Sequence, residues 1–504
     1  MSETAVRSSI TFRLDQEEIT VQGISPTTTV LNFLRDHLGR KGSKEGCAEG
    51  DCGACTVVIA DLHRGQLRYR PVNACIQFLP LLDGKQLYTV ESLRPAPGEL
   101  HPVQQALVDC HASQCGFCTP GFVMSLFAFY KNHASASREQ LTTALSGNLC
   151  RCTGYRPIIE AGLVMYDYAQ AVPSPEISAL TAPAGNPVGQ DVLIQQLQAL
   201  AADPRSVALA HGQQRFFAPK TLVELAGYLA AYPDAVLLAG GTDVGLWVSK
   251  QHRDIATLVY LGNIAELTTL TEQDGWLDIG AAVLLEDAYT RLVQHYPVLQ
   301  DLHSRFASLP IRSAGTLVGN VANGSPIGDS MPLLLALDAH VVLRKGDETR
   351  ELALEAFYLG YQQTALQAGE FVQAVRVPLP SAGRALRSYK ISKRFGQDIS
   401  AVCGAFCVAL ENGRVSQIRM AFGGMAAIPA RAYHTEDVLR NQPWDNASVE
   451  QAMQALASDF SPLSDLRASA HYRMQVARNL LLKFYLQTAE PAVQTGVTRR
   501  EVCV

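Results

Sequence analysis

The sequence has no long run of apolar residues, although 47% of its 504 residues are hydrophobic. A helix that crosses a bilayer needs about 20 consecutive apolar residues, so the sequence predicts no membrane span. Residues 1–9 have neither the basic start nor the apolar centre of a secretory signal, and they are too short for an Arg- and Ser-rich transit peptide. We therefore expect a cytoplasmic protein.

An excess of charge of one sign is also missing. The chain has 42 Lys and Arg against 47 Asp and Glu, which gives a net charge of −5 and a pI near 6.2. Nucleic-acid-binding domains usually carry a clustered basic surface, so nucleic acid is not an expected partner. Internal repeats are absent, and so are the short motifs of serine hydrolases, zinc peptidases and P-loop NTPases.

Cysteine is the distinctive residue of this chain. Its length predicts three or four domains, yet nine of its twelve cysteines fall in about a hundred residues, and all of these except Cys110 are grouped. A disulfide framework is not expected, because such frameworks belong to small secreted domains. The eight cysteines form two groups of four, Cys47, Cys52, Cys55 and Cys75, then Cys115, Cys118, Cys150 and Cys152.

The spacing of each group indicates its chemistry. The first group reads C-x4-C-x2-C followed by a distant fourth cysteine, which is the plant-type spacing for a [2Fe–2S] cluster. The second group reads C-x2-C, a long gap, then C-x-C. Four cysteines also suit structural zinc, but zinc sites more often use two C-x2-C units. The zinc alternative therefore stays open mainly for the second group when it is considered alone.

The elements around the cysteines favour an anionic ligand. Residues 9–22 alternate apolar and polar side chains and predict a β-hairpin, and Thr28 is expected to cap the helix that follows. Thr119 is expected to cap a helix with Pro120 in its first turn, and Ser137 with Gln140 predicts a capping box. The second cysteine group would thus lie at helix N-termini, where free N–H groups favour negative charge.

A further pair of segments predicts a nucleotide site. Residues 235–245 run from an apolar strand into a Gly-Gly-Thr-Asp turn whose N–H groups can approach a pyrophosphate, although such a turn is often only a turn. Residues 305–332 combine Gly, Ser, Asn and Pro with little charge, which is typical of a loop that lines a ligand.

Four segments, 44–57, 73–77, 114–125 and 147–158, resemble the iron–sulfur region of the molybdenum hydroxylases, the xanthine dehydrogenase and aldehyde oxidase family. Residues 235–245 and 305–332 are similar to the FAD-binding domain of that family, which is of the PCMH type. The resemblance implies a multidomain α+β chain. Its expected parts are a β-grasp plant-type ferredoxin domain (1–92), a helical [2Fe–2S] domain (93–171), a linker (172–212), the FAD-binding domain (213–382), a C-terminal small α/β domain (383–490) and a tail (491–504).

The resemblance also implies site residues. All eight cysteines would bind iron, and Gln114 and Arg151 would lie near the molybdenum cofactor of another chain. Phe306 would lie against the isoalloxazine, and Tyr361 near the nicotinamide of NAD. The other implied FAD contacts are Leu238, Ala239, Gly240, Gly241, Thr242, Asp243, Val244, Gly245, Thr316, Gly319, Asn320, Ser325, Asp329, Val372 and Lys390.

The implied function is electron transfer. A large molybdopterin-binding partner subunit, in an (αβ)2 heterotetramer, would oxidise hypoxanthine and xanthine to urate. The electrons would pass from this partner through two [2Fe–2S] clusters to FAD and then to NAD. No catalytic residue is expected on this chain. An aldehyde or another N-heterocycle as substrate, oxygen as acceptor, and a zinc-stabilised scaffold are the alternatives. Cys110, Cys403 and Cys407 are expected to be core thiols, and Cys503 an exposed one.

Overall fold

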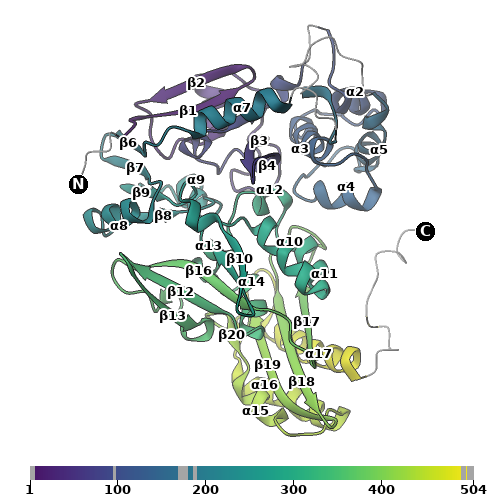
Figure 1. Ribbon diagram of the computed structural model, residues 1–504. Coiled ribbons are helices and arrows are strands. Elements are labelled where there is room, and N and C mark those ends of the chain that lie inside the picture. Colours follow the sequence, from purple (N-terminus) through teal and green to yellow (C-terminus); the bar gives the residue numbers. More distant parts are fainter. Residues whose placement is uncertain (1–5, 95–97, 169–179, 186–189, 490–494, 496–504) are drawn as a thin grey trace. The chain divides into compact units, whose positions relative to one another are not determined.

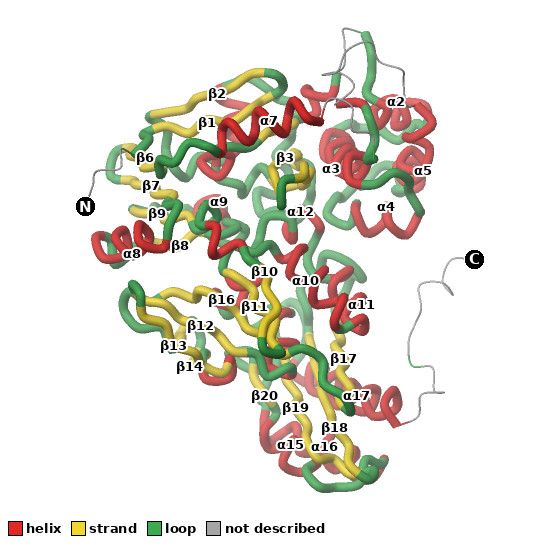
Figure 2. The backbone as a smooth tube through the Cα atoms, viewed as in Figure 1, coloured by secondary structure: helices red, strands yellow, loops and turns green. Residues whose placement is uncertain are grey.

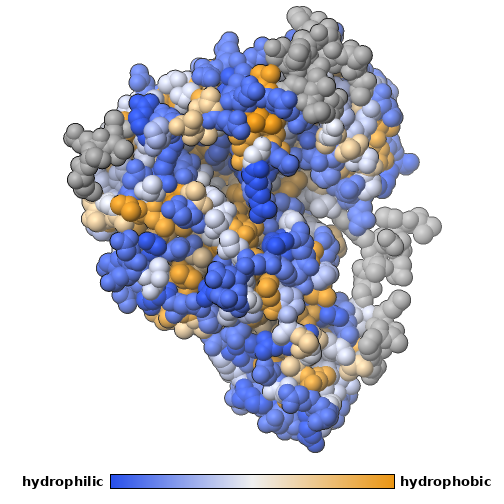
Figure 3. Space-filling model, viewed as in Figure 1, coloured by the Kyte–Doolittle hydropathy of each residue, from blue (hydrophilic) through white to orange (hydrophobic). Residues whose placement is uncertain are grey.

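The computed structural model describes residues 6–94, 98–168, 180–185, 190–489 and 495. The chain divides into two compact units (Figure 1). The first unit comprises Met1–Glu266, Leu284–Glu286 and Ala307–Thr316, and the second comprises Leu267–Val283, Asp287–Phe306 and Leu317–Val504. None of the described helices combines the length and the apolar character that crossing a bilayer requires. On the face seen in Figure 3, polar residues surround separate apolar patches.

The first unit begins with a five-stranded sheet of order β2-β1-β5-β3-β4. The predicted hairpin is confirmed, because β1 and β2 pair antiparallel from Ser9↔Gln22 to Leu14↔Glu17. The helical turn after it is capped by Thr29, whose hydroxyl accepts from Asn32 N at 3.1 Å, so the prediction that Thr28 is the cap was wrong. Thr28 still belongs to the preceding turn, since its N–H donates to Ser25 O. The elements are β1 Ser9–Leu14, β2 Glu17–Gln22, α1 Val30–Asn32, a π-helical turn Phe33–His37, β3 Thr56–His63, β4 Gln66–Asn73, 3-10 turns Leu79–Leu82 and Val90–Leu93, and β5 Gln86–Tyr88.

A group of helices covers the β3–β4 side of this sheet. Helix α3 is buried from Gly121 to Lys131, and its apolar residues share a core with Val58 and Tyr69. Cys118, not Thr119, occupies the N-cap position of α3, which corrects the predicted start by one residue. The Ser137–Gln140 capping box is confirmed. The helices are α2 Pro102–Asp109, α3 Thr119–Asn132, α4 Arg138–Ala144 and α5 Arg156–Val164, followed by a 3-10 turn Met165–Tyr168.

The rest of the first unit holds a second sheet of order β6-β7-β9-β8, in which β7 and β8 each pair parallel with β9 (Figure 2). Thr221 caps α8 as in the sequence pattern, because its hydroxyl accepts from Glu224 N at 3.2 Å. The elements are α7 Gln190–Ala201, β6 Val207–His211, β7 Gln214–Ala218, α8 Leu222–Ala231, β8 Val236–Leu238, α9 Val244–Ser249, β9 Thr257–Tyr260 and α12 Leu309–Arg312; a 3-10 turn, Ala265–Thr268, follows β9.

The second unit contains an antiparallel sheet of order β10-β11-β16-β12-β13, another of order β17-β18-β19-β20, and the short ladder β14-β15. Residues 305–332 were predicted to be a loop, but much of this segment is helical, because its apolar residues recur at helical spacing and are buried. The elements are β10 Leu270–Gln273, β11 Trp276–Gly280, α10 Leu285–His295, α11 Gln300–Arg305, α13 Leu317–Asn323, α14 Ser330–Ala336, β12 His340–Lys345, β13 Glu348–Ala353, β14 Tyr358–Gly360, β15 Gln363–Thr364, β16 Phe371–Pro378, β17 Arg384–Ile391, β18 Val402–Glu411, β19 Arg414–Gly423, β20 Ala430–Arg431, α15 Tyr433–Leu439, α16 Asn446–Asp459 and α17 Ala470–Ala489, with 3-10 turns Pro297–Leu299 and Leu354–Ala356.

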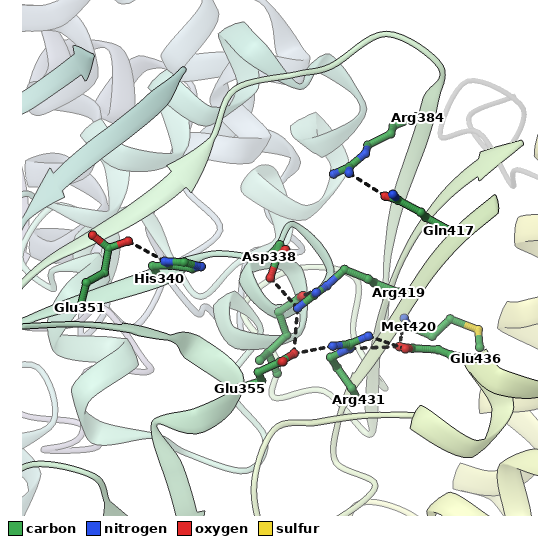
Figure 4. A network of polar contacts seen from close by, with 11 residues as sticks. Asp338, His340, Glu351, Glu355, Arg384, Gln417, Arg419, Met420, Arg431 and Glu436 are labelled. Atoms are coloured by element: carbon green, nitrogen blue, oxygen red, sulfur yellow. Dashed lines mark hydrogen bonds and ion pairs between the residues drawn. The ribbon is translucent and has the colours of Figure 1, made fainter. Parts of the chain in front are cut away.

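A network of charged side chains joins these sheets within the second unit (Figure 4). Arg431 pairs with Glu436, whose side chain is 1% exposed, and also with Glu355. Glu355 accepts in turn from Arg419 at 2.9 Å, and Arg419 contacts Asp338 at 2.8 Å. Burial raises the pKa of Glu436, while Arg431 and the N–H of Met420 at 2.7 Å act in the opposite direction. The buried carboxylate therefore depends on Arg431 for compensation.

Replacement of Arg431 by Met should destabilise the protein by about 3–5 kcal/mol, because it leaves a buried carboxylate without its cation. Equilibrium urea unfolding measures the loss. Arg440→Met is the matched control, since Arg440 pairs with Asp437 where both side chains are more than half exposed, at 56% and 64%. That change should cost ~0–1 kcal/mol. Equal losses of unfolding free energy in the two variants would contradict the view that the buried ion pairs stabilise the protein more than the exposed pair.

Candidate functional site

Three cysteines of the first group, Cys47, Cys52 and Cys55, lie in a loop that connects the π-helical turn to β3. The side chain of Arg35 donates to Ser43 O at 2.8 Å, and Gly42 N donates to the Glu91 carboxylate at 2.7 Å. These contacts fix the start of the loop. Its end is fixed by the β3–β4 ladder, in which Thr56 pairs with Asn73. We call the loop, residues 40–55, the cluster-1 loop.

The four thiols of the first group come together as the spacing predicts. Cys47 contacts the thiols of Cys52 and Cys75, and Cys75 also contacts Cys55. Cys55 and Cys75 are buried, at 1% and 3% exposure, and the other two are half-buried. Cys75 follows β4, so it closes the group from the opposite side of the cluster-1 loop. We call this group the cluster-1 site.

The electrostatics of the cluster-1 site favour bound cationic metal. The neighbouring thiols of Cys52 and Cys75 lower the pKa of Cys47, and the N–H groups of Glu49 and Cys52 point at its sulfur at 3.4 Å. The pKa of Cys52 and that of Cys75 are raised, chiefly by Cys47. Four thiols this close cannot all ionise unless positive charge lies among them, and iron supplies that charge.

The second group, the cluster-2 site, is more exposed. Cys115 and Cys152 are exposed and contact each other, whereas Cys118 and Cys150 are half-buried and form the other contact. Burial raises the pKa of Cys118 to about 12. The hydroxyl of Thr153 donates to Cys150 Sγ at 3.2 Å, which favours the thiolate at that position. This group lies at the N-terminal ends of α3 and α5, as the sequence predicts.

Direct backbone contacts join the two sites. Leu149 N donates to Cys52 O at 3.0 Å, and the side chain of Asn148 donates to Gly53 O at 3.2 Å while accepting from Ser125 at 2.7 Å. A Cβ atom at Gly53, whose φ is +69°, would collide with the backbone of Gly147. Only glycine permits this approach, so the segment before Cys150 is in direct contact with the backbone of the first site.

The donor sets fit [2Fe–2S] clusters. Each site supplies four cysteines, contacts between thiols and N–H groups aimed at sulfur, and such a cluster divides four thiolates between two irons. Within the described ranges, no three or more His, Cys, Asp or Glu side chains are grouped so as to hold one single metal ion, whereas each iron of a [2Fe–2S] cluster needs only two of the four thiolates. Gln114 and Arg151, predicted to face another chain's cofactor, are both exposed beside the exposed cysteines.

The predicted pyrophosphate segment lies in the first unit. Strand β8 ends at Leu238, the Gly-Gly-Thr-Asp turn follows, and Val244 begins α9. Gly241 has φ +75°, and its carbonyl oxygen accepts a hydrogen bond from Gly245 N at 2.7 Å. Burial raises the pKa of the Asp243 carboxyl, so this side chain resists a negative charge of its own. Thr316, 5% exposed, is in the same unit.

This segment contacts the cluster-1 loop directly. The hydroxyl of Ser249 donates to Ala48 O at 2.8 Å, and Lys250 approaches Glu49 at 3.6 Å. A Cβ atom at Gly245 would lie 2.5 Å from the carbonyl oxygen of Ile76, the residue after Cys75. The structure therefore places α9, the helix after the predicted pyrophosphate turn, beside the cluster-1 loop.

The other predicted FAD contacts lie in the second unit. Gly319 and Asn320 are in α13, Val372 is in β16, and Ser325 is in the segment before α14. Asn320 Oδ1 is buried without a hydrogen-bond partner among the described residues. A ligand with polar groups would satisfy this atom, so it fits a nucleotide cofactor. These residues of the second unit are thus compatible with a bound FAD.

Lys390 and Asp329 are brought together in the second unit. Lys390 Nζ lies 2.5 Å from Asp329 Oδ2, both side chains are nearly buried at 2% and 7%, and Ser400 donates to the other carboxylate oxygen at 2.5 Å. Phe306, 6% exposed, packs on Tyr289 with ring centroids 5.1 Å apart. Tyr361 is 60% exposed, next to β14.

Sequence reasoning missed four residues that the structure places at these sites: Asn73, Asn148, Ser249 and Ser400. Asn148 and Asn73 each lie two residues before a cysteine of the two groups, which was the signal available for them. Nothing in the sequence pattern singles out Ser249 or Ser400. Cys403 and Cys407 are buried in β18 as predicted, whereas Cys110 is only half-buried at the end of α2; Cys503 lies outside the described residues.

Comparison with known families agrees with these sites. Residues 12–78 match a 2Fe-2S iron-sulfur cluster binding domain, and residues 89–163 match a [2Fe-2S] binding domain. Residues 211–380 match the FAD binding domain in molybdopterin dehydrogenase, and residues 387–488 match the CO dehydrogenase flavoprotein C-terminal domain. The chain belongs to the molybdenum hydroxylase family. The expected multidomain α+β fold, with two cluster-binding domains and an FAD-binding domain, is confirmed.

Relatives from this family cover most of the chain. Xanthine dehydrogenase of Emericella nidulans is 32% identical over 95% of this chain and 38% of its own length. Aldehyde oxidase 4 of Cavia porcellus is 29% identical over 94% of this chain and 39% of its own length. The chain therefore spans about two fifths of the length of these curated relatives.

Solved structures of the family are similar to about half of the chain. A carbon monoxide dehydrogenase chain from Hydrogenophaga pseudoflava aligns with a TM-score of 0.51 and 28% identity, over 53% of this chain and 94% of its own. A chain of quinoline 2-oxidoreductase from Pseudomonas putida 86 aligns with a TM-score of 0.50 and 25% identity, over 55% and 97%. The similarity thus covers nearly all of each solved chain and about half of this one.

Replacement of Gly245 by Ala should push α9 away from the backbone that follows Cys75, because its Cβ would lie 2.5 Å from Ile76 O, a backbone atom that has little room to move. The expected cost is about 1–3 kcal/mol in urea unfolding. Gly227→Ala is the control: Gly227 is in α8 with nothing within 4 Å of the added Cβ, so it should stabilise by about 0.5–1 kcal/mol. An unchanged free energy of unfolding in Gly245→Ala would contradict the close contact.

Proposed function

We propose that this chain is the iron–sulfur and FAD subunit of a two-subunit, NAD-dependent xanthine dehydrogenase. Electrons would enter at the cluster-2 site, pass to the cluster-1 site, then to FAD and NAD. A molybdopterin-binding partner, in an (αβ)2 heterotetramer, would oxidise hypoxanthine and xanthine to urate. The assignment of all eight cysteines and of the FAD contacts belongs to the same proposal.

The observation that carries this order is the chain of contacts through the first unit. The cluster-2 site meets the cluster-1 loop through the hydrogen bond from Leu149 to Cys52, and that loop meets α9, which follows the predicted pyrophosphate turn, through the hydrogen bond from Ser249 to Ala48. Only the cluster-2 site has exposed ligands. Iron–sulfur clusters carry single electrons and nicotinamide takes a hydride, so FAD supplies the conversion when it is bound.

The surface around the cluster-2 site supports a protein partner there. Phe117, Leu149 and Tyr155 are 48%, 41% and 40% exposed, beside the exposed Cys115 and Cys152. Apolar side chains grouped around a redox centre exclude water once a partner covers them. We propose that the molybdenum-bearing subunit docks on this surface, with Gln114 and Arg151 within its edge.

A second candidate is the same relay for a different substrate. The similarity to aldehyde oxidase 4 and to quinoline 2-oxidoreductase supports partners that hydroxylate aldehydes or N-heterocycles. Turnover of the assembled complex with xanthine, an aldehyde and quinoline distinguishes them. Comparison of NAD with oxygen as acceptor in the same assay tests the acceptor.

Purified protein should contain about four irons and one FAD per chain, because two four-cysteine sites and one flavin domain are present. Metal analysis, flavin release and an absorption spectrum before and after dithionite measure this. A preparation with zinc in place of iron, or one that dithionite does not bleach, would instead support the zinc-stabilised scaffold.

Replacement of Cys115 by Ser should remove one cluster, leaving about two irons per chain, and should stop electrons from the partner from reaching FAD. EPR of the reduced protein and flavin reduction by substrate measure both effects. Cys110→Ser is the matched control, because Cys110 is a half-buried thiol of the same helical segment outside both groups. Two intact EPR signals in Cys115→Ser would refute the ligand assignment.

A further inference from the structure

Asn73 is a buried amide without a hydrogen-bond partner. It is 2% exposed at the end of β4, and neither Nδ2 nor Oδ1 has a partner among the described residues. Its backbone is well fixed, because its carbonyl accepts from Ile76 N and Gln77 N at 3.2 Å. A buried amide that forms no hydrogen bond costs free energy, so its presence requires an explanation.

The other buried amides of this region contrast with Asn73. Asn148, 3% exposed, donates to Gly53 O and accepts from Ser125. Gln86, 1% exposed in the same sheet, donates to Asp15 O and Leu87 O at 3.1 and 3.0 Å. The unsatisfied amide is therefore a local feature of Asn73 and not a general property of this unit.

The surroundings of Asn73 point to the cluster-1 site. Oδ1 lies 3.7 Å from the position that a Cβ atom would take at Gly50, in the cluster-1 loop. Asn73 also lies two residues before Cys75, one of the four thiols of that site. Asn73 is also paired with Thr56, the residue after Cys55. The amide thus lies among the protein atoms that surround cluster 1.

Sulfur atoms of a [2Fe–2S] cluster are anionic and accept hydrogen bonds, and these bonds raise the reduction potential, because the reduced cluster carries one more negative charge. We propose that the side-chain amide of Asn73 donates a hydrogen bond to a sulfur atom of cluster 1. This hydrogen bond raises the reduction potential of cluster 1. This inference rests on the proposed function, and it makes cluster 1 the better acceptor of electrons from cluster 2.

The test is a redox titration of the full-length protein followed by EPR, in Asn73→Leu and Asn73→Asp. Both variants should shift the midpoint potential of cluster 1 downwards and leave that of cluster 2 unchanged. Asp should shift it further, because it replaces the donor by a negative charge of the same shape. Gln86→Leu, which removes a buried amide elsewhere in the sheet, should leave both potentials unchanged.

An unchanged cluster-1 potential in variants that retain about four irons per chain, or an equal shift of both clusters, would overturn the inference. Should neither variant retain cluster 1, pulsed EPR of the protein with 15N in its asparagine side chains decides. A coupling between reduced cluster 1 and a side-chain nitrogen is expected, persisting in Asn148→Gln, and its absence overturns the inference. Wild-type protein without iron would instead refute the proposed function itself.

Discussion

The backbone contact between the two cysteine sites is the constraint on which the rest of the first unit depends. Leu149 donates to Cys52 O, and Asn148 donates to Gly53 O, so the residues that precede Cys150 are fixed to the residues between two cysteines of the first site. Helix α3 buries almost its whole length against β3 and β4 behind this contact, which explains why a long apolar helix follows Cys118 directly.

Much of this arrangement could be predicted because its signals are local. The β1–β2 hairpin, the capping box at Ser137 and the spacing of the cysteines each depend on a few neighbouring residues. Helix starts at Thr29 and Cys118 were missed by one residue, because the turn before each helix decides at which residue the helix begins. Residues 305–332 carried turn-forming residues that suggested a loop, yet the burial of their apolar side chains favours short helices.

Partners distant in the sequence could not be predicted. The sequence identified Lys390 and Asp329 as separate cofactor contacts, but the structure pairs them with each other and adds Ser400 as a second donor to the carboxylate. A ligand that contacts these residues would therefore meet the Lys390–Asp329 ion pair and not a free ammonium group. The contact of Ser249 with Ala48 and the isolated amide of Asn73 likewise arise only when segments far apart in the chain pack together.

The unequal exposure of the two cysteine sites affects how the protein must be assembled. Cys55 and Cys75 are shielded by their own domain, whereas Cys115 and Cys152 are open to solvent. Thiolates that solvent reaches are the ones that oxidants and chelators attack. In the complex that we propose, the subunit that covers the cluster-2 site would shield Cys115 and Cys152 from such attack, whereas Cys55 and Cys75 are already shielded by this chain.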